Sequence, residues 1–307
     1  MTAVTLVEVS PRDGLQNDPA DLATEAKIEL VARVAAAGAR RVEVTSFVSP
    51  RAVPKMADAE AVVAGLRARR LTGVSLIGLV VNERGVARAA AAGVDEVNAV
   101  VVASDTFNRR NQGAPTAETL ARLPDLVGAA RAAGLGVSVT VGAAFGCPFE
   151  GEVPVGRLAD VVAAVAAAGP DEIALADTIG VAVPADVAER VPVARELVGP
   201  SLRLRAHFHD TRNTAVANAL AAVGLGVEAL DASLGGLGGC PFAPAATGNV
   251  ATEDLVYALG RSGVAHGLDL AALIEASRWL GRAVGHDLPA VLPKAGPFPP
   301  AAAPGGS

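Results

Sequence analysis

The chain has few aromatic residues, few cysteines and no excess of basic residues. Only 3% of its 307 residues are aromatic, so its core must consist of aliphatic side chains. Two cysteines are too few for a disulfide scaffold and favour a reducing compartment. With 26 basic against 32 acidic residues, the net charge of −6 excludes a broadly basic nucleic-acid surface. We therefore expect no nucleic-acid partner.

Long uninterrupted apolar runs are also missing, although hydrophobic residues make up 51% of the chain. Stretches such as 161–168 are short, and longer alanine-rich ones are cut by Arg, Glu, Asp or Gly before the ~20 residues that span a bilayer. The N-terminus lacks a basic segment followed by a long apolar run, so no signal peptide is expected. The sequence predicts a soluble, cytoplasmic protein with no membrane partner.

What the sequence does contain is one repeated pattern, a short β-branched run followed by a longer Ala- and Leu-rich segment. The predicted strands are 4–9, 41–45, 74–81, 96–102, 137–141, 172–176, 202–208 and 229–233. The predicted helices are 24–37, 57–69, 83–92, 116–133, 155–168, 184–198, 213–224 and 252–260. Eight such units close a (β/α)8 TIM barrel, whereas a doubly wound open sheet has the same alternation.

The placement of polar residues favours the barrel. Several of them follow the C-terminal ends of different strands, which converge on one mouth in a barrel but are strung along an edge in an open sheet. These residues are Arg12, Asp13, Glu43, Asp177, His207, His209 and Cys240. A further helix is predicted at 268–284. We assign residues 1–287 to one α/β domain, a TIM barrel with an additional C-terminal helix, and residues 288–307 to a Pro/Gly/Ala-rich disordered tail.

The strongest local signal is a pair of histidines on the seventh predicted strand. In Ala-His-Phe-His-Asp, period-two alternation places His207 and His209 on one face, close enough to bind one metal ion. Asp13, after the first strand, would add a hard ligand and bias the site toward Mg²⁺ or Mn²⁺. Arg12 beside it could clamp a carboxylate or stabilise an oxyanion. The structural alternatives are a hydrogen-bonded core histidine pair and a surface Arg–Asp pair.

A glycine-rich loop after the eighth strand contains one of the two cysteines. Four glycines within residues 235–239 give the freedom expected of a mobile lid, on which Cys240 would be a general acid or a nucleophile. A phosphate-binding loop and a plain connector are the alternatives. Cys147 lies in a similar Gly-Cys-Pro-Phe segment and is interpreted as structural.

Two carboxylates lie within or at the end of predicted strands. Glu43 lies inside the second strand, where a buried carboxylate needs a partner, and it could orient Arg12. Asp177 ends the sixth strand and could play the same part. A structural salt bridge is the alternative for each.

Together these motifs resemble the 3-hydroxy-3-methylglutaryl-CoA lyase family of metal-dependent (DRE-TIM) barrel lyases. The matching segments run in order from about residue 4 to 284 and are 7–17, 42–50, 176–180, 207–211, 235–241 and 248–257. Related synthases share Arg-Asp-Gly and His-x-His but usually continue with Glu-Gln, where this chain has Leu15-Gln16. They also carry extra domains that this length excludes.

The resemblance implies a role for each matching residue. The Mg²⁺ or Mn²⁺ ligands would be Asp13, His207, His209 and Asn249. Arg12 would stabilise the enolate of the departing acetyl-CoA, and Cys240 would take part in proton transfer. His207 would remove the substrate's hydroxyl proton. Glu43 and Asp177, together with Glu8 and Glu253, would be acidic residues of the active-site neighbourhood.

The implied reaction is a retro-Claisen cleavage of 3-hydroxy-3-methylglutaryl-CoA to acetyl-CoA and acetoacetate. Residues 139–144 read Val-Thr-Val-Gly-Ala-Ala, where well-known lyases carry Tyr, Ser and Cys. Citramalyl-CoA or another 3-hydroxyacyl-CoA is therefore the alternative substrate. A metal-dependent aldolase of a free keto acid and a non-catalytic binding barrel are the alternatives from other classes. We expect an acyl-CoA substrate and a homodimer or higher homo-oligomer.

Overall fold

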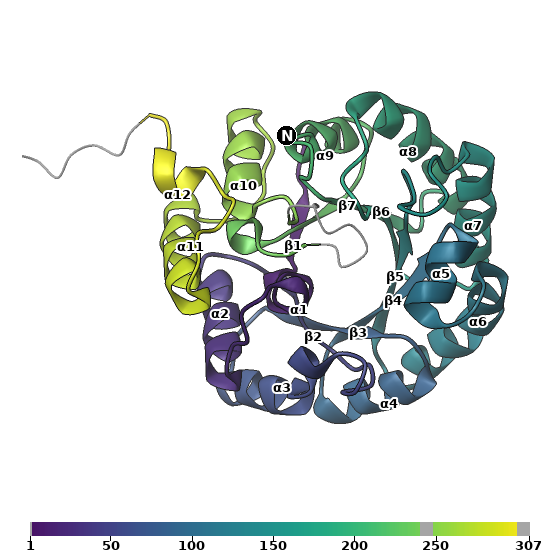
Figure 1. Cartoon of the computed structure of the whole chain (residues 1–307), viewed down its shortest axis with the longest axis horizontal. Helices are drawn as coiled ribbons and strands as arrows, with labels where there is room; N and C mark the ends of the chain where they lie inside the picture. The colour runs from purple at the N-terminus through teal and green to yellow at the C-terminus, as the bar shows by residue number, and fades with distance from the viewer. Residues whose placement is uncertain (1, 240–247, 300–307) are drawn as a thin grey trace, which may run out of the picture.

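The parallel strands pair in sequence order, and β8 pairs back to β1, which closes the sheet (Figure 1). This computed structural model describes residues 2–239 and 248–299. The strands are β1 (Thr5–Glu8), β2 (Arg41–Ser46), β3 (Ser75–Val80), β4 (Glu96–Val102), β5 (Gly136–Gly142), β6 (Glu172–Asp177), β7 (Arg203–Phe208) and β8 (Ala229–Ala232). The closure confirms the predicted (β/α)8 TIM barrel and excludes an open sheet, whose edge strands stay unpaired.

Most helices form a ring around the barrel and follow the strands in turn, whereas α1 lies inside that ring in the view of Figure 1. They are α1 (Leu15–Asn17), α2 (Thr24–Ala36), α3 (Ala59–Ala68), α4 (Glu83–Ala92), α5 (Asp105–Gln112), α6 (Thr116–Ala132), α7 (Val155–Ala167), α8 (Pro184–Val198), α9 (Ala215–Gly224), α10 (Thr252–Arg261), α11 (Leu270–Val284) and α12 (Leu292–Ala295). The predicted C-terminal helix is α11. Helix α5 escaped prediction because its sequence is almost entirely polar. In the described ranges no helix is both long and apolar enough to cross a membrane.

The main apolar core lies between the strands and the helices, while many side chains inside the barrel are polar. On β2, Val42 and Val44 belong to the main apolar core, and the alternate residues Arg41 and Glu43 make polar contacts across the barrel. This alternation follows from the period of two in a strand. It leaves the barrel interior free to hold charged and hydrogen-bonding groups.

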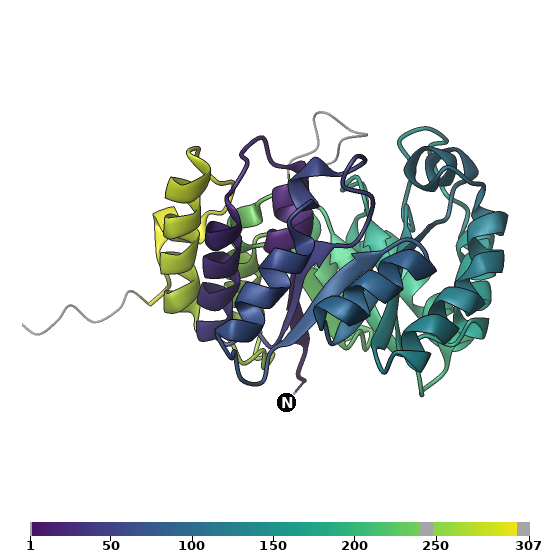
Figure 2. The same ribbon diagram turned by 90° about the horizontal axis from the view of Figure 1, so that it is seen from below.

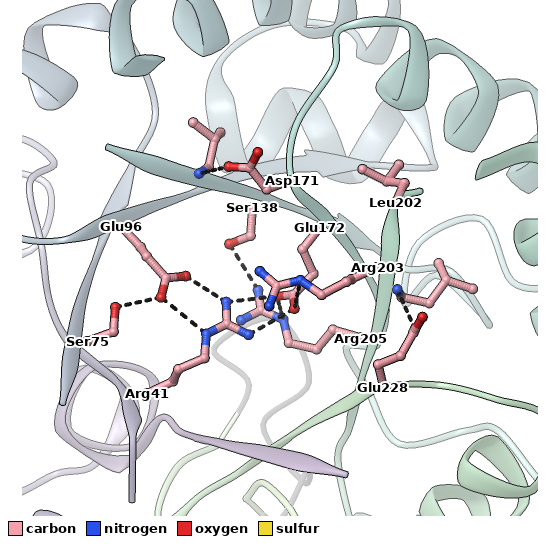
Figure 3. A network of polar contacts seen from close by, with 12 residues as sticks. Arg41, Ser75, Glu96, Ser138, Asp171, Glu172, Leu202, Arg203, Arg205 and Glu228 are labelled. Carbon is pink, nitrogen blue, oxygen red and sulfur yellow. Dashed lines mark hydrogen bonds and ion pairs between the residues drawn. The ribbon is translucent and has the colours of Figure 1, made fainter. Parts of the chain in front are cut away.

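Five ionisable side chains form a charged layer inside the barrel: Arg41, Glu96, Glu172, Arg205 and Asp231 (Figure 3 labels the first four). Arg41 donates to Glu172 at 2.8 Å and to Glu96 at 2.6 Å. Arg205 is fully buried, and its Nε lies 3.4 Å from both Glu172 Oε1 and Asp231 Oδ1. Each charge therefore has an opposite charge beside it, which buried ionic groups require.

The C-terminal residues 288–299 differ from the disordered tail expected there. Leu288, Ala290 and Leu292 are buried, and Leu292–Ala295 forms α12 beside α11 (Figure 1). The backbone N–H groups of Val291 and Leu292 donate to the Asp254 carboxylate of α10 at 2.9 and 2.8 Å. Proline and glycine exclude long regular elements, but they do not exclude packing when the intervening residues are apolar. Residues 300–307 lie outside the described residues.

Substitution of Arg205 tests the charged layer. Arg205→Met is expected to lower the free energy of unfolding by about 3–5 kcal/mol, because it leaves Glu172 and Asp231 buried with less compensation. Arg203→Met is the matched control, since Arg203 lies 3.8 Å from the same Glu172 but its side chain is 53% exposed. Its loss should cost below about 1 kcal/mol. If both substitutions lowered the free energy of unfolding equally in guanidinium chloride, the buried contacts of Arg205 would not be what stabilises the barrel interior.

Candidate active site

A π-helical turn, η1 (Ser10–Gly14), directly follows β1 and presents Arg12 and Asp13 to the barrel mouth. In the side view the N-terminus lies below the barrel and α1, which continues from this turn, lies above it (Figure 2). The N–H of Asp13 donates to Val9 O at 2.8 Å, which fixes the turn on the strand end. Short π-helical turns are frequent at functional sites. The first βα loop thus places both predicted residues at the same mouth as the end of β7.

Arg12 is held by two carboxylates. Its Nε donates to Glu43 Oε1 and its Nη1 to Asp13 Oδ1, both at 2.6 Å. Burial lowers the pKa of Arg12, but the charges of Glu43 and Asp13 outweigh it, so the net pKa is raised. The predicted orienting role of Glu43 agrees with this contact. The guanidinium is a permanent positive charge with a fixed direction, suited to an anionic oxygen.

Asp13, His207 and His209 form a cluster in which one ligand atom of each lies within 4.8 Å of the others. Burial raises the pKa of Asp13, but Arg12 and His207 outweigh it and lower the pKa to about 2. Burial, together with His207, lowers the pKa of His209 to about 4. An ionised carboxylate beside a neutral imidazole is the protonation state that metal binding requires.

Asn249 completes the predicted ligand set. Its Nδ2 donates to Asp13 Oδ2 at 2.9 Å, while its Oδ1 is buried and has no hydrogen-bond partner in the described part of the chain. A buried amide oxygen without a partner costs free energy unless a ligand or ion satisfies it. One carboxylate, one amide oxygen and two imidazole nitrogens fit a divalent ion that accepts oxygen and nitrogen ligands. The donor set therefore fits the predicted metal.

Asp231 is a site residue that the sequence reasoning missed. His207 and Asp231 are register partners on β7 and β8, and Nδ1 of His207 lies 3.0 Å from Oδ2 of Asp231. Burial lowers the pKa of His207, but the hydrogen bond to Asp231 outweighs it and raises the net pKa. A carboxylate on Nδ1 leaves Nε2 as the one lone pair that this imidazole offers. The signal that could have found Asp231 is its register position across from His207.

Asp177 makes its hydrogen bonds within the turn that follows β6. Both carboxylate oxygens of Asp177 accept backbone N–H groups, from Val181 and Ala182 at 3.0 Å. That geometry closes the turn after β6. Burial raises the pKa of Asp177. Cys240 lies outside the described residues, so its role stays a prediction. Cys147 is buried and accepts a hydrogen bond from Ser104 at 2.9 Å.

A cavity of about 180 Å³ opens above the cluster. Arg12, Asp13, His207 and His209 line one part of it, and residues of β3 to β6 line another. Asn98 of β4 is polar, and the others are small or apolar: Leu79, Val100, Val102, Thr140, Gly142 and Ala176. A ligand bound here would meet an ionic group set at one end and a mainly aliphatic wall at the other.

Comparison with known proteins agrees with this geometry. Residues 3–280 match the HMGL-like family model. The chain belongs to the HMGL-like family. A relative in this family, the (R)-citramalyl-CoA lyase of Chloroflexus aurantiacus, is 45% identical over 98% of this chain and 97% of that protein. The hydroxymethylglutaryl-CoA lyase of Bacillus subtilis is 40% identical over 93% of this chain and 95% of that protein.

A solved member of the HMGL-like family has the same architecture. The HMG-CoA lyase of Acinetobacter baumannii, in complex with coenzyme A and 3-methylmalate, superposes with a TM-score of 0.91. It is 40% identical and covers 97% of this chain and 96% of its own. These relatives confirm the family resemblance derived from the motifs, and they identify the chain as a lyase.

Glu253, at the start of α10, makes stability depend on pH. It is fully buried, and burial raises its pKa from 4.5 to about 7. In the unfolded chain this carboxyl ionises near pH 4.5, whereas in the folded protein it stays protonated up to about pH 7. Raising the pH between these two values therefore stabilises the unfolded state relative to the folded state. The free energy of unfolding should therefore fall between pH 4.5 and 7, by about 3 kcal/mol in total. In urea unfolding, the free energy of unfolding of Glu253→Gln should not show this fall with pH. If the free energies of the wild type and of Glu253→Gln changed in parallel with pH, Glu253 would not be the group responsible.

Proposed function

We propose that this chain is a divalent-metal-dependent lyase that cleaves a 3-hydroxy-3-methylacyl-CoA with a free carboxylate and releases acetyl-CoA. The observation that carries the proposal is the set Asp13, His207, His209 and Asn249 beside a fixed Arg12. Among the described residues, the buried amide oxygen of Asn249 has no hydrogen-bond partner. A Mg²⁺ or Mn²⁺ ion held by these residues would polarise the substrate's hydroxyl and carboxylate oxygens.

The residues of the chain account for the charges that move during a retro-Claisen cleavage. Breaking the bond between the acyl-CoA methylene and the hydroxyl-bearing carbon leaves a negative charge on the thioester enolate. Arg12, held by Glu43 and Asp13, is the cation placed to stabilise that oxygen. We assign removal of the hydroxyl proton to Nε2 of His207, with Asp231 stabilising the imidazolium. Protonation of the enolate by Cys240 rests on the family resemblance.

His207 carries two proposed roles that use the same atom. Since Nδ1 faces Asp231, both metal ligation and proton removal need the Nε2 lone pair. One lone pair cannot serve both at the same moment. Measuring Mn²⁺ affinity and turnover of His207→Gln separates them: retained affinity with lost turnover assigns proton removal, and loss of both assigns ligation.

The acyl substrate has two candidates. 3-Hydroxy-3-methylglutaryl-CoA, which would give acetyl-CoA and acetoacetate, is favoured by the relatives and solved structures that carry that enzyme's name. Citramalyl-CoA, shorter by one methylene, is favoured by the Chloroflexus relative, which carries that enzyme's name. Both carry the hydroxyl and carboxylate that the proposed ion would bind.

A cytoplasmic location and a homo-oligomeric state also stay proposals.

A substrate panel tests the proposed reaction. With added Mn²⁺, we expect cleavage of at least one of the two CoA esters, detected as acetyl-CoA formation, and no cleavage of the free acids. The ratio of kcat/KM values decides between the two substrates. Cleavage of a free keto acid at an equal rate would favour the aldolase alternative, and no turnover of either ester would refute the proposal.

Replacing His209 tests the metal site. His209→Ala is expected to weaken Mn²⁺ binding at least tenfold and to abolish turnover, because it removes a ligand whose neutral form is favoured by burial. The circular dichroism spectrum should stay that of the wild type. His266→Ala is the control, because it removes a half-buried histidine that is not among the proposed ligands. Full activity in a chelator-treated preparation would contradict metal dependence.

A further inference from the structure

We propose that the C-terminal strap, residues His286–Leu292, positions the two loops that carry Asp13 and Asn249. The strap begins in the last two residues of the predicted domain and continues into residues 288–292, for which the sequence predicts disorder, and it contacts both loops in the structure. The inference rests on the proposed function, because it concerns the metal site proposed there. His286 and Leu288 are assigned as positioning residues, since they act through other residues rather than on the substrate.

The first contact reaches the loop that follows β1. Nε2 of His286 lies 3.0 Å from both carboxylate oxygens of Asp18, a residue 268 positions earlier in the chain. Nδ1 of His286 donates to Asp287 O at 3.1 Å. The hydrogen bond to Asp18 and the contact with Asp287 O raise the pKa of His286. Asp18 is only 5% exposed, so the ion pair is anchored on a buried carboxylate.

Asp18 is directly connected to the metal-site turn. Its N–H donates to Gly14 O at 3.1 Å, and the neighbouring Asn17 donates through Nδ2 to Asp13 O at 3.2 Å. The segment from Asp13 to Asp18 is therefore one hydrogen-bonded unit. Holding Asp18 fixes the far end of that unit and limits rotation of Asp13 at its near end.

The second contact reaches the turn η3 (Leu234–Gly236), which follows β8. The N–H of Ala290 donates to Gly235 O at 3.1 Å. Leu288 packs directly against Gly235, whose φ of +71° and lack of a β-carbon make room for that side chain. Two buried carboxylates also hold this turn: Glu8 accepts from Leu234 N at 2.9 Å, and Glu253 accepts from Gly235 N at 3.0 Å.

This turn leads to Asn249 through Leu237. The N–H of Leu237 donates to Leu234 O at 3.3 Å, and Leu237 O accepts the Nδ2 of Asn249 at 3.2 Å. The same Nδ2 donates to Asp13 Oδ2. The amide of Asn249 is thus oriented by one acceptor from each of the two loops that the strap holds. A shift of either loop would turn Oδ1 of Asn249 away from the other ligands.

Paired substitutions on the strap test the inference. His286→Ala removes the contact with Asp18, and Leu288→Ala removes the contact with Gly235. Val291→Ala is the matched control, because its side chain is 58% exposed on the same segment and its backbone hydrogen bonds to Asp254 remain. His286→Gln keeps a donor toward Asp18 and serves as the conservative replacement.

The first measurement is hydrogen–deuterium exchange without metal or substrate. We expect His286→Ala to speed exchange about tenfold in peptides covering residues 13–20, and Leu288→Ala to do so in peptides covering 233–238. Peptides from α4 and α6, on another side of the barrel, should be unchanged. Exchange in these two peptides equal to that of Val291→Ala would overturn the inference.

The second measurement is Mn²⁺ binding followed by electron paramagnetic resonance. His286→Ala and Leu288→Ala should weaken binding about three- to tenfold, while His286→Gln and Val291→Ala stay within about twofold of the wild type. Lower thermal stability with unchanged Mn²⁺ affinity would mean that the strap only stabilises the fold, which contradicts positioning. A wild-type protein that binds no Mn²⁺ would refute the proposed metal site, whereas the exchange measurement would still test the strap.

Discussion

The contact between Arg205 and Asp231 joins the interior of the barrel to its active site. Arg205 is completely buried, so its charge must be neutralised inside the protein. Asp231 does this with one carboxylate oxygen and contacts His207 with the other. One carboxylate therefore serves both the stability of the barrel interior and the orientation of a candidate catalytic imidazole.

Period-two alternation explains why the charged layer and the site lie one above the other. On β2 the inward residues Arg41 and Glu43 are two positions apart, and on β7 the same holds for Arg205 and His207. Two residues along a strand span about 6.6 Å, roughly one layer of side chains. A one-residue slip of either strand would turn both residues toward the apolar core outside the barrel. The charges that the interior requires thus also fix the register that places the site.

The sequence was sufficient for the strands, the main helices and the grouping of Asp13 with His207 and His209, because each has a local signal. Asn249 was named only through the family resemblance. β-Branched runs ending in polar residues mark the strands, and His-x-His marks one face of β7. Asp231 has no such signal, since an isolated aspartate in a short strand becomes informative only when the register with His207 is known. The contacts of the strap were missed for a related reason. The partner of His286, Asp18, is 268 residues away, and the composition of the residues from 288 onward indicates disorder.

The candidate metal site is formed where the two ends of the barrel sheet meet. Asp13 follows the first strand, His207 and His209 end the seventh strand or directly follow it, and Asn249 follows the eighth. Pairing of β8 with β1 brings the residues that follow these two strands together. The isolated bridges from His209 to Asn249 and from Ser233 to Ala251 hold the segment of Asn249 beside the ends of β7 and β8. Neither loop alone has more than one of the two oxygen ligands, so the complete ligand set exists only in the closed barrel. An ion that binds this set would bind the closed barrel in preference to any opened form, and by linkage it would stabilise the closure that creates its own site.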